Sequence, residues 1–292
     1  MKRSKNLLRK GAALAAMSTV LVSQAPLINA FAYGEADVSQ STFKQDTDNS
    51  ADFQNWISNV WQGGEKAYAQ TENVALTPGS DAADLNFSWY SAGKGTPAVK
   101  VWKDGSKSSA KVVTGNAEAI SAENWQGKSY SAANKVNIAD YFEENTQYHY
   151  QYTDNYTGDD SVWSAEYDYT TKATDKFSVI LTGDPQVGAS GSSSDKSAND
   201  ASVARDAYNW NKTMQQALKT CPDASFLLSA GDQINQSGAT KDDDKKTRES
   251  EYAGYLYPSV FRSLPIAATI GNHDMALSLI HISEPTRHSL IS

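Results

Sequence analysis

Three short apolar runs in the second half of the chain constrain its fold more than any other feature. They cover residues 177–182, 225–230 and 266–270, and each reads as a strand buried on both faces of a sheet. The region between the first two runs predicts a helix over 200–219, and a second helical stretch over 249–262 precedes the third. The first helix has apolar residues at helical spacing, namely Val203, Ala207, Trp210, Met214 and Ala217. This β-α-β-α-β order predicts a parallel sheet with right-handed crossovers.

Each apolar run ends in a polar motif. The motifs are Gly183-Asp184-Pro185-Gln186, Gly231-Asp232 and Gly271-Asn272-His273-Asp274. The carboxyl ends of parallel strands line a common crevice, so we expect the three motifs to converge, with each glycine allowing a sharp exit from its strand. Crowded carboxylates repel one another unless cations neutralise them, and oxygen donors suit ions such as Zn, Mn or Fe. Two metal ions about 3.5–4 Å apart could clamp a phosphate and activate a water.

The first half of the chain shows an all-β pattern over 72–174. Apolar and aromatic residues alternate along short runs, and glycine-containing turns separate the runs. Leu85, Phe87 and Trp89 share one face of one run, and Tyr148, Tyr150 and Tyr152 share a face of another. Short alternating strands at this spacing predict a β-sandwich of about a hundred residues. The polar segment before it, 33–71, contains one short predicted helix, with Phe53, Trp56, Ile57, Val60 and Trp61 at helical spacing.

Residues 1–32 have the pattern of a secretory signal peptide. Five basic residues precede a short apolar stretch, and Ala30 and Ala32 supply small residues for cleavage after Ala32, with cleavage after Ala30 as the alternative. We therefore expect a secreted, extracellular or cell-surface protein with no stable membrane span. Removing five basic residues from a chain of net charge −8 leaves −13, which argues against binding to a nucleic-acid backbone. Cys221 is the only cysteine, so no internal disulfide can form, and we expect it to be structural.

Residues 72–276 together resemble a purple acid phosphatase. The resemblance implies a fibronectin type III-like β-sandwich (72–174) followed by the N-terminal part of a calcineurin-like α/β metallophosphoesterase domain (175–276), which is incomplete. It implies a hydrolase that uses two metal ions, Fe, Zn or Mn, to cleave phosphate esters of small-molecule substrates. It also implies that Asp184 ligates the first metal, that Asp232 bridges both metals, that Asn272 ligates the second, and that His273 is catalytic and acts on the phosphate.

The chain departs from the family pattern at two positions. Purple enzymes carry a tyrosinate ligand three residues after the bridging aspartate, where this chain has Asn235. The broader superfamily often has histidine two residues after the first aspartate, where this chain has Gln186. Gln186, Asn235 and Asp274 are therefore expected either to ligate a metal or to support the ligands. His149 is expected to lie on a strand and to face solvent.

Residues 277–292 look like the translation of a sequencing-library adapter fused to a truncated gene. We therefore expect them to be non-native, and we do not offer His281 and His288 as ligands; the alternative is a genuine C-terminal strand. Because the family completes its site with histidines further along the chain, we expect the intact parent to be the enzyme and this fragment to be inactive. The alternative function is a non-catalytic secreted surface or binding module with a degenerate phosphoesterase domain.

Overall fold

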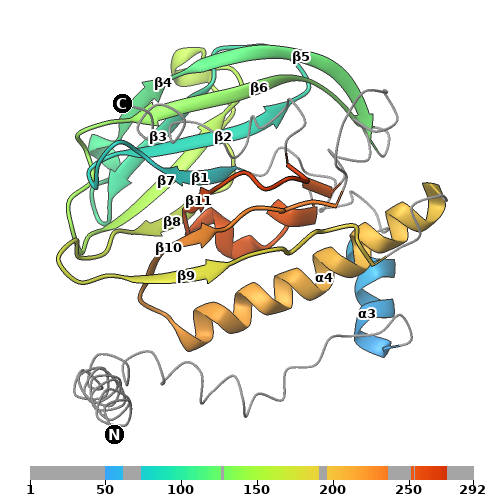
Figure 1. Ribbon diagram of the computed structural model, residues 1–292. Helices are drawn as coiled ribbons and strands as arrows, with labels where there is room; N and C mark the ends of the chain where they lie inside the picture. The colour runs from blue at the N-terminus through green and yellow to red at the C-terminus, as the bar shows by residue number, and fades with distance from the viewer. Residues whose placement is uncertain are drawn as a thin grey trace, which may run out of the picture. The chain divides into compact units, whose positions relative to one another are not determined.

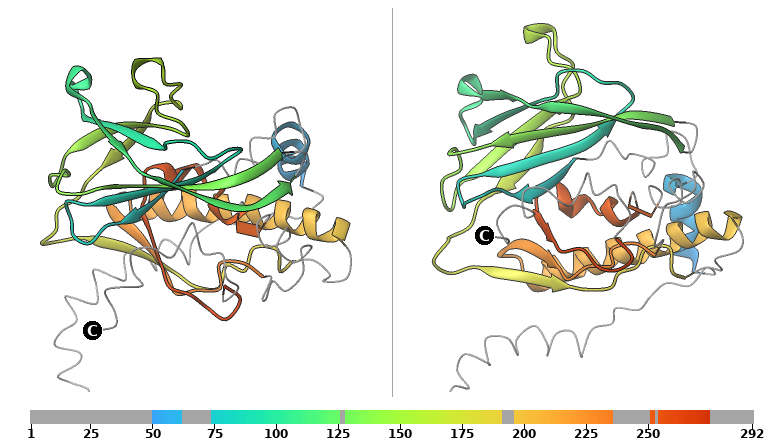
Figure 2. Two further views of the ribbon diagram at one scale, coloured as in Figure 1. Left: turned by 90° about the horizontal axis from the view of Figure 1, so that it is seen from above. Right: turned by 45° about the horizontal axis from the view of Figure 1, so that its top comes forward.

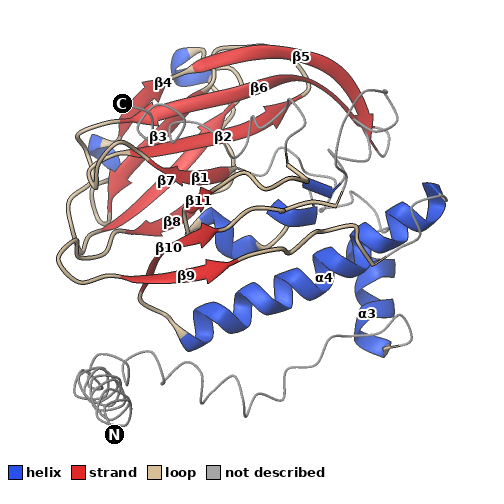
Figure 3. Cartoon of the chain, in the orientation of Figure 1, coloured by secondary structure: helices blue, strands red, loops and turns tan. Residues whose placement is uncertain are grey.

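The computed structural model describes residues 50–61, 74–125, 128–190, 196–235, 251–252 and 254–274, all within one compact unit. These residues are mostly β-sheet with few helices (Figures 1 and 3). The predictions for the signal peptide (1–32) and the tail (277–292) fall outside the described residues. Within the described part, none of the helices is long and apolar enough to span a membrane.

Eight strands form two antiparallel sheets that pack face to face, as the alternating pattern of the first half predicted. The first sheet has the order β1-β2-β6-β5 and the second the order β4-β3-β7-β8. The first sheet comprises β1 (Ala75–Pro78), β2 (Leu85–Ser91), β6 (Lys128–Ile138) and β5 (Asn116–Trp125). The second comprises β4 (Lys111–Thr114), β3 (Ala98–Lys103), β7 (Gln147–Thr153) and β8 (Tyr167–Thr170). Short 3-10 turns at η3 (Lys107–Ser109) and η4 (Gly158–Asp160) lie between strands.

The two sheets share a core of aliphatic and aromatic side chains. Leu85 and Phe87 of β2 face Tyr148 and Tyr150 of β7, all of them at most 1% exposed. The rings of Phe87 and Tyr150 meet edge to face with centroids 5.1 Å apart, a geometry that aromatic quadrupoles favour. Burying each such ring contributes about 1.5–3 kcal/mol, so this core stabilises the sandwich.

The second half of the chain forms the predicted parallel sheet and its helix. The strand order is β11-β10-β9, and both pairings are parallel. The strands are β9 (Ser178–Thr182), β10 (Ala224–Ser229) and β11 (Ile266–Ala268), and the helix α4 spans Lys196–Thr220. Leu227 of β10 pairs with Ile180 of β9 and with Ile266 of β11, and these residues face α4. Figures 1 and 2 show α4 running along this sheet.

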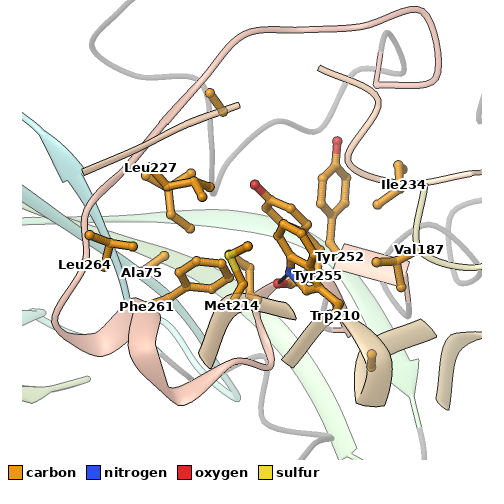
Figure 4. Close-up of a cluster of buried hydrophobic side chains, with 14 of the residues drawn as sticks. Ala75, Val187, Trp210, Met214, Leu227, Ile234, Tyr252, Tyr255, Phe261 and Leu264 are labelled. Atoms are coloured by element: carbon orange, nitrogen blue, oxygen red, sulfur yellow. Dashed lines mark hydrogen bonds between the residues drawn. The ribbon is translucent and has the colours of Figure 1, made fainter. Parts of the chain in front are cut away.

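A core of mostly aliphatic and aromatic residues lies between α4 and the sheet (Figure 4). Trp210 of α4 stacks on Tyr255, with ring centroids 5.5 Å apart, and its indole N–H donates to the Tyr255 carbonyl at 2.9 Å. The predicted helical face is confirmed, because Val203, Ala207, Trp210 and Met214 are buried in this core and Ala217 packs against it. Cys221 also packs there, and its N–H donates to the Ala217 carbonyl at the end of α4.

The short predicted helix in the segment 33–71 is confirmed and packs on α4. It begins with α3 (Ala51–Trp56) and continues as a π-helical turn, η1 (Ile57–Trp61). Ser50 is the N-cap, and its hydroxyl oxygen accepts from the Phe53 N–H at 3.1 Å. The rings of Phe53 and Trp56 lie 5.4 and 5.0 Å from that of Tyr208 in α4.

The sandwich and the parallel sheet are joined by direct contacts. The Tyr150 hydroxyl donates to the Arg262 carbonyl at 2.7 Å, in a buried position. Arg262 ends η5 (Ser259–Arg262), the 3-10 turn that precedes β11. Ala75 of β1 is 1% exposed and belongs to the core beneath α4 rather than to the sandwich core. The sandwich therefore supports one end of the parallel sheet, and the loops that carry the three polar motifs lie at the other end.

Two expectations about the second half were wrong. The strand β9 is not buried on both faces, because α4 covers only one face of the sheet: Leu181 is 70% exposed, and its neighbour in register, Leu228, is 37% exposed. The helix expected over 249–262 is also interrupted. Helical residues end at Leu256, and a 3-10 turn follows Pro258, which disfavours the helical conformation for the residue before it.

Candidate functional site

The loops that follow β9 and β10 run side by side, bound through their backbones. The Asp184 N–H donates to the Gly231 carbonyl at 3.2 Å, and the Gln186 N–H donates to the Asp232 carbonyl at 2.9 Å. Beyond the motifs, Val187 and Ile234 form a parallel bridge, and both are fully buried. The first two motifs therefore converge at one edge of the sheet.

The loop that follows β11 joins the other two through Asp232. The backbone N–H of His273 donates to the Asp232 Oδ1 at 2.8 Å. In the opposite direction, the Asp232 N–H donates to the Asp274 Oδ2 at 2.6 Å. Residues more than 40 positions apart are thus held together by reciprocal hydrogen bonds, and the expected convergence of all three motifs is seen.

Asp274 binds the backbones of the second and third loops. Its side chain is fully buried, and its two oxygens accept three backbone N–H groups: Asp232 at 2.6 Å, Gly271 at 2.9 Å and Gln233 at 3.0 Å. Burial raises the pKa of Asp274 above its ordinary value, although the three N–H donors oppose that shift. Asp274 therefore clamps the second and third loops together.

Three residues of the candidate site have left-handed backbones although none is glycine. Asp184 has φ +58°, Gln186 +35° and Asp232 +52°. Residues in this region cost roughly 1–3 kcal/mol each, and they persist where surrounding contacts determine them. The backbone hydrogen bonds of Asp184, Gln186 and Asp232 supply such contacts. This concentration of strain at adjacent strand ends is typical of functional sites.

The glycines of the motifs act differently from the sharp exits that we expected. Only Gly231 has a positive φ, at +107°. A Cβ on Gly231 would lie 2.6 Å from the Gly271 nitrogen, and a Cβ on Gly271 would lie 2.0 Å from the Asp232 Oδ1. Gly183 has no such constraint, because its nearest neighbour would be 3.4 Å away. Gly231 and Gly271 are required by the close approach of the two loops.

The predicted ligands differ in their exposure. Asp184 and Asn272 are exposed, whereas Asp232, which follows the central strand β10, is half-buried. The Gln186 side-chain amide donates to the Asp184 Oδ1 at 2.7 Å. Asp184 and Asp232 thus each have one oxygen engaged in a hydrogen bond within the site.

The His273 ring is held by the backbone of Asn235. Its Nδ1 lies 2.5 Å from the Asn235 carbonyl oxygen. A carbonyl oxygen only accepts, so Nδ1 must carry the proton, and the neutral ring then has its lone pair on Nε2. Asn235, three residues after Asp232, therefore orients the His273 imidazole through its backbone carbonyl rather than through its side chain.

The oxygen donors of this site fit only part of a metal centre. Among the described residues, the only group of three His, Cys, Asp or Glu side chains with mutually close ligand atoms is Asp81, Asp84 and Asp140, in the sandwich. Apart from Asp274, which is buried and bound to three backbone N–H groups, the strand-end motifs supply two carboxylates, Asp184 and Asp232, and the amide oxygen of Asn272. The described histidines are His273, whose Nδ1 is engaged, and His149, which lies in the sandwich. The imidazole donors expected for a dinuclear centre are not supplied by the described residues.

His149 does not simply face solvent as expected. Its side chain is 15% exposed, with Nδ1 2.6 Å from Asp168 and Nε2 3.1 Å from Asp104. Partial burial disfavours the charged ring, but the hydrogen bonds to Asp104 and Asp168 outweigh it and raise the pKa of His149. Strand alternation correctly predicts that His149 lies on the outer face of β7. It does not predict the contacts with Asp104 and Asp168, because these carboxylates come from other segments of the chain.

The chain was compared with protein-family models and with curated proteins, and neither comparison finds a match.

Proposed function

We propose that the loops after β9, β10 and β11 form the oxygen-donor part of a dinuclear metal centre that hydrolyses phosphate esters. The observation that carries this proposal is the reciprocal bonding of the second and third loops, in which the Asp232 amide is held by Asp274 and the Asp232 carboxylate by the His273 N–H. This network fixes a half-buried carboxylate after β10, the central strand of the sheet, while exposed oxygen donors follow β9 (Asp184) and β11 (Asn272). A bridging ligand would be expected at the central position.

The roles follow from the donors present. Asp184 and Asn272 would each hold one metal ion, and Asp232 would bridge the two, as the resemblance to purple acid phosphatases implies. The bound ions would neutralise the phosphate oxygens and activate water. His273 has Nδ1 bound to the Asn235 carbonyl, so its Nε2 is the nitrogen that can hold or deliver a proton to a leaving oxygen.

We also propose an assignment for each of the two parts of the fold. The face-to-face sheets of β1–β8 are consistent with a fibronectin type III-like domain, and the β9-α4-β10-β11 unit is consistent with the start of a calcineurin-like domain. Secretion is proposed from the sequence pattern of residues 1–32 alone. His273 is the one described imidazole at this edge of the sheet, and the resemblance does not make it a metal ligand. We therefore propose that this chain binds metal weakly and has no turnover, while the intact parent is the enzyme.

One observation favours the second candidate, a non-catalytic surface or binding module. The Gln186 amide donates to the Asp184 Oδ1, so a side chain that departs from the superfamily pattern satisfies the expected first ligand without a metal ion. A degenerate phosphoesterase domain would be expected to accumulate substitutions of this kind. We rank it second because left-handed backbones at three non-glycine residues of adjacent strand ends, Asp184, Gln186 and Asp232, are typical of functional sites.

The test separates metal binding from turnover. Calorimetric titration of the full chain with Mn²⁺ should give weak binding that Asp232→Asn abolishes, whereas Asp159→Asn, an exposed carboxylate in η4, should leave it unchanged. Hydrolysis of p-nitrophenyl phosphate should be absent from this chain. It should be present when the gene's own continuation replaces the residues after 276, and chelation or Asp232→Ala should then abolish it. Activity that survives both treatments would show that the mechanism is wrong.

A further inference from the structure

A second candidate site lies away from the strand-end loops, where the sandwich meets the opposite end of the parallel sheet. A pocket of about 340 Å³ opens there, within the size range of small-molecule sites. Its walls come from the β1–β2 turn, from the segment after β8, and from the start of β10. Ligand sites occur preferentially where two domains meet, and this pocket lies at such a junction.

One wall of the pocket is aromatic. Phe177 and Phe226 stack with ring centroids 6.3 Å apart, and Phe177 remains 58% exposed. Tyr169 also lines the pocket, and burial raises its pKa to about 12, so the phenol is neutral at physiological pH. An exposed phenylalanine beside two further rings offers an apolar body a surface on which to stack.

Another part of the pocket wall is acidic. Asp81 and Asp84 line the pocket, and with Asp140 they place carboxylate oxygens within 4.8 Å of one another. The hydrogen bond from the Ser80 hydroxyl holds the pKa of Asp84 below its ordinary value, so this buried carboxyl is ionised at neutral pH. Among the described residues, no lysine, arginine or histidine forms an ion pair with any of the three. The wall therefore carries uncompensated negative charge.

The pocket wall also contains one serine and one lysine, Ser225 and Lys172. Ser225 is half-buried, and its Oγ has no hydrogen-bond partner among the described residues. The Lys172 Nζ lies 3.9 Å from the Asp223 Oδ1, and Asp223 does not line the pocket. Lys172 thus has an acidic partner of its own.

We propose that this pocket binds a small organic cation with an apolar or aromatic body. The body would stack on Phe177 and Phe226, and an ammonium group would face Asp81 and Asp84. This site is separate from the proposed phosphoesterase centre, because none of its lining residues belongs to the strand-end motifs. Its occupancy does not depend on whether that centre is active.

The first experiment uses 2-phenylethylammonium as the probe and the full chain, followed by ligand-observed NMR. A ligand of this size should bind with Kd of about 1–10 mM. The neutral isostere 2-phenylethanol should bind about tenfold more weakly, because it lacks the charge that faces the acidic wall. Equal binding of the amine and the alcohol would overturn the proposal.

Two variants test the acidic and the aromatic parts of the wall separately. Both substitutions replace exposed side chains, so we expect folding to be preserved. Asp81→Asn and Phe177→Ala should each weaken binding of the amine by about fivefold to tenfold, as loss of one partly exposed charge or one aromatic contact implies. Asp159→Asn, an exposed carboxylate outside the pocket, is the matched control and should change nothing. Unaltered binding in both pocket variants would place the probe elsewhere.

A calcium titration separates an organic-cation site from a metal site. Ca²⁺ alone should bind the acidic wall no more tightly than the millimolar range, and it should compete only weakly with the amine. Micromolar Ca²⁺ binding that excludes the amine would identify the three carboxylates as a metal site and overturn the proposal. Circular dichroism of each variant checks that the secondary structure is unchanged.

Discussion

Replacing Asp274 with alanine tests whether one buried carboxylate holds the candidate site together. The change leaves three backbone N–H groups, those of Asp232, Gly271 and Gln233, without their acceptor. Each unsatisfied buried donor costs about 1–3 kcal/mol, but two of the three residues are half-buried and water can reach them. We therefore expect Asp274→Ala to lower the free energy of unfolding by about 3–5 kcal/mol. Asp274→Asn, which keeps one oxygen, should cost about 1–2 kcal/mol.

Urea unfolding followed by tryptophan fluorescence measures the change. The matched control is Asp84→Ala, which removes another buried carboxylate that accepts a backbone N–H, from Asp140 at 2.9 Å, but in the sandwich. Both variants should be destabilised, but only the substitution at Asp274 should also weaken Mn²⁺ binding. A free energy of unfolding for Asp274→Ala within about 0.5 kcal/mol of the parent would refute the role of this residue as a clamp.

Three further outcomes follow from the structure. Gly271→Ala should weaken Mn²⁺ binding by tenfold or more in calorimetry, because its Cβ would lie 2.0 Å from the Asp232 Oδ1, whereas Gly93→Ala, with open space around it, should bind normally. The raised pKa of His149 means that its charged form stabilises the fold; the contribution is fully present below the unfolded pKa of about 6.5 and is lost as pH rises through the higher folded pKa. The melting temperature of His149→Gln should therefore fall below that of the parent at pH 5 and match it at high pH; a constant gap would contradict this. Leu181→Ser should change the free energy of unfolding by less than about 0.5 kcal/mol and reduce the fluorescence of an apolar dye, since Leu181 is 70% exposed; a loss above about 1 kcal/mol would mean that this side chain is buried.

Periodicity predicted the elements of the second half well because the physical cause is local. The apolar residues of α4 recur at helical spacing, and the helix can bury only the face that carries them. The same argument was wrong about the burial of β9. A continuous apolar run shows that both faces of a strand are apolar, but it cannot show that both are covered, and Leu181 remains exposed on the face opposite α4.

The convergence of the motifs was predictable from the parallel order of the strands, but the contacts that hold them were not. Asp274 accepts from Asp232 across 42 positions, and Asn235 orients His273 through a carbonyl oxygen that every residue type possesses. The acidic wall of the second pocket also depends on distance in sequence, since Asp140 lies 56 residues from Asp84. Such pairings arise from tertiary packing, and no local pattern records them.

The two glycines at the crossing of the second and third loops have a consequence for how this chain can vary. Gly231 is constrained by its own positive φ and by the backbone of Gly271, and Gly271 is constrained by Asp232. A larger residue at either position can be accommodated only if one of the two loops moves, and such a movement would displace Asp232. Natural variants that retain Asp232 should therefore retain both glycines.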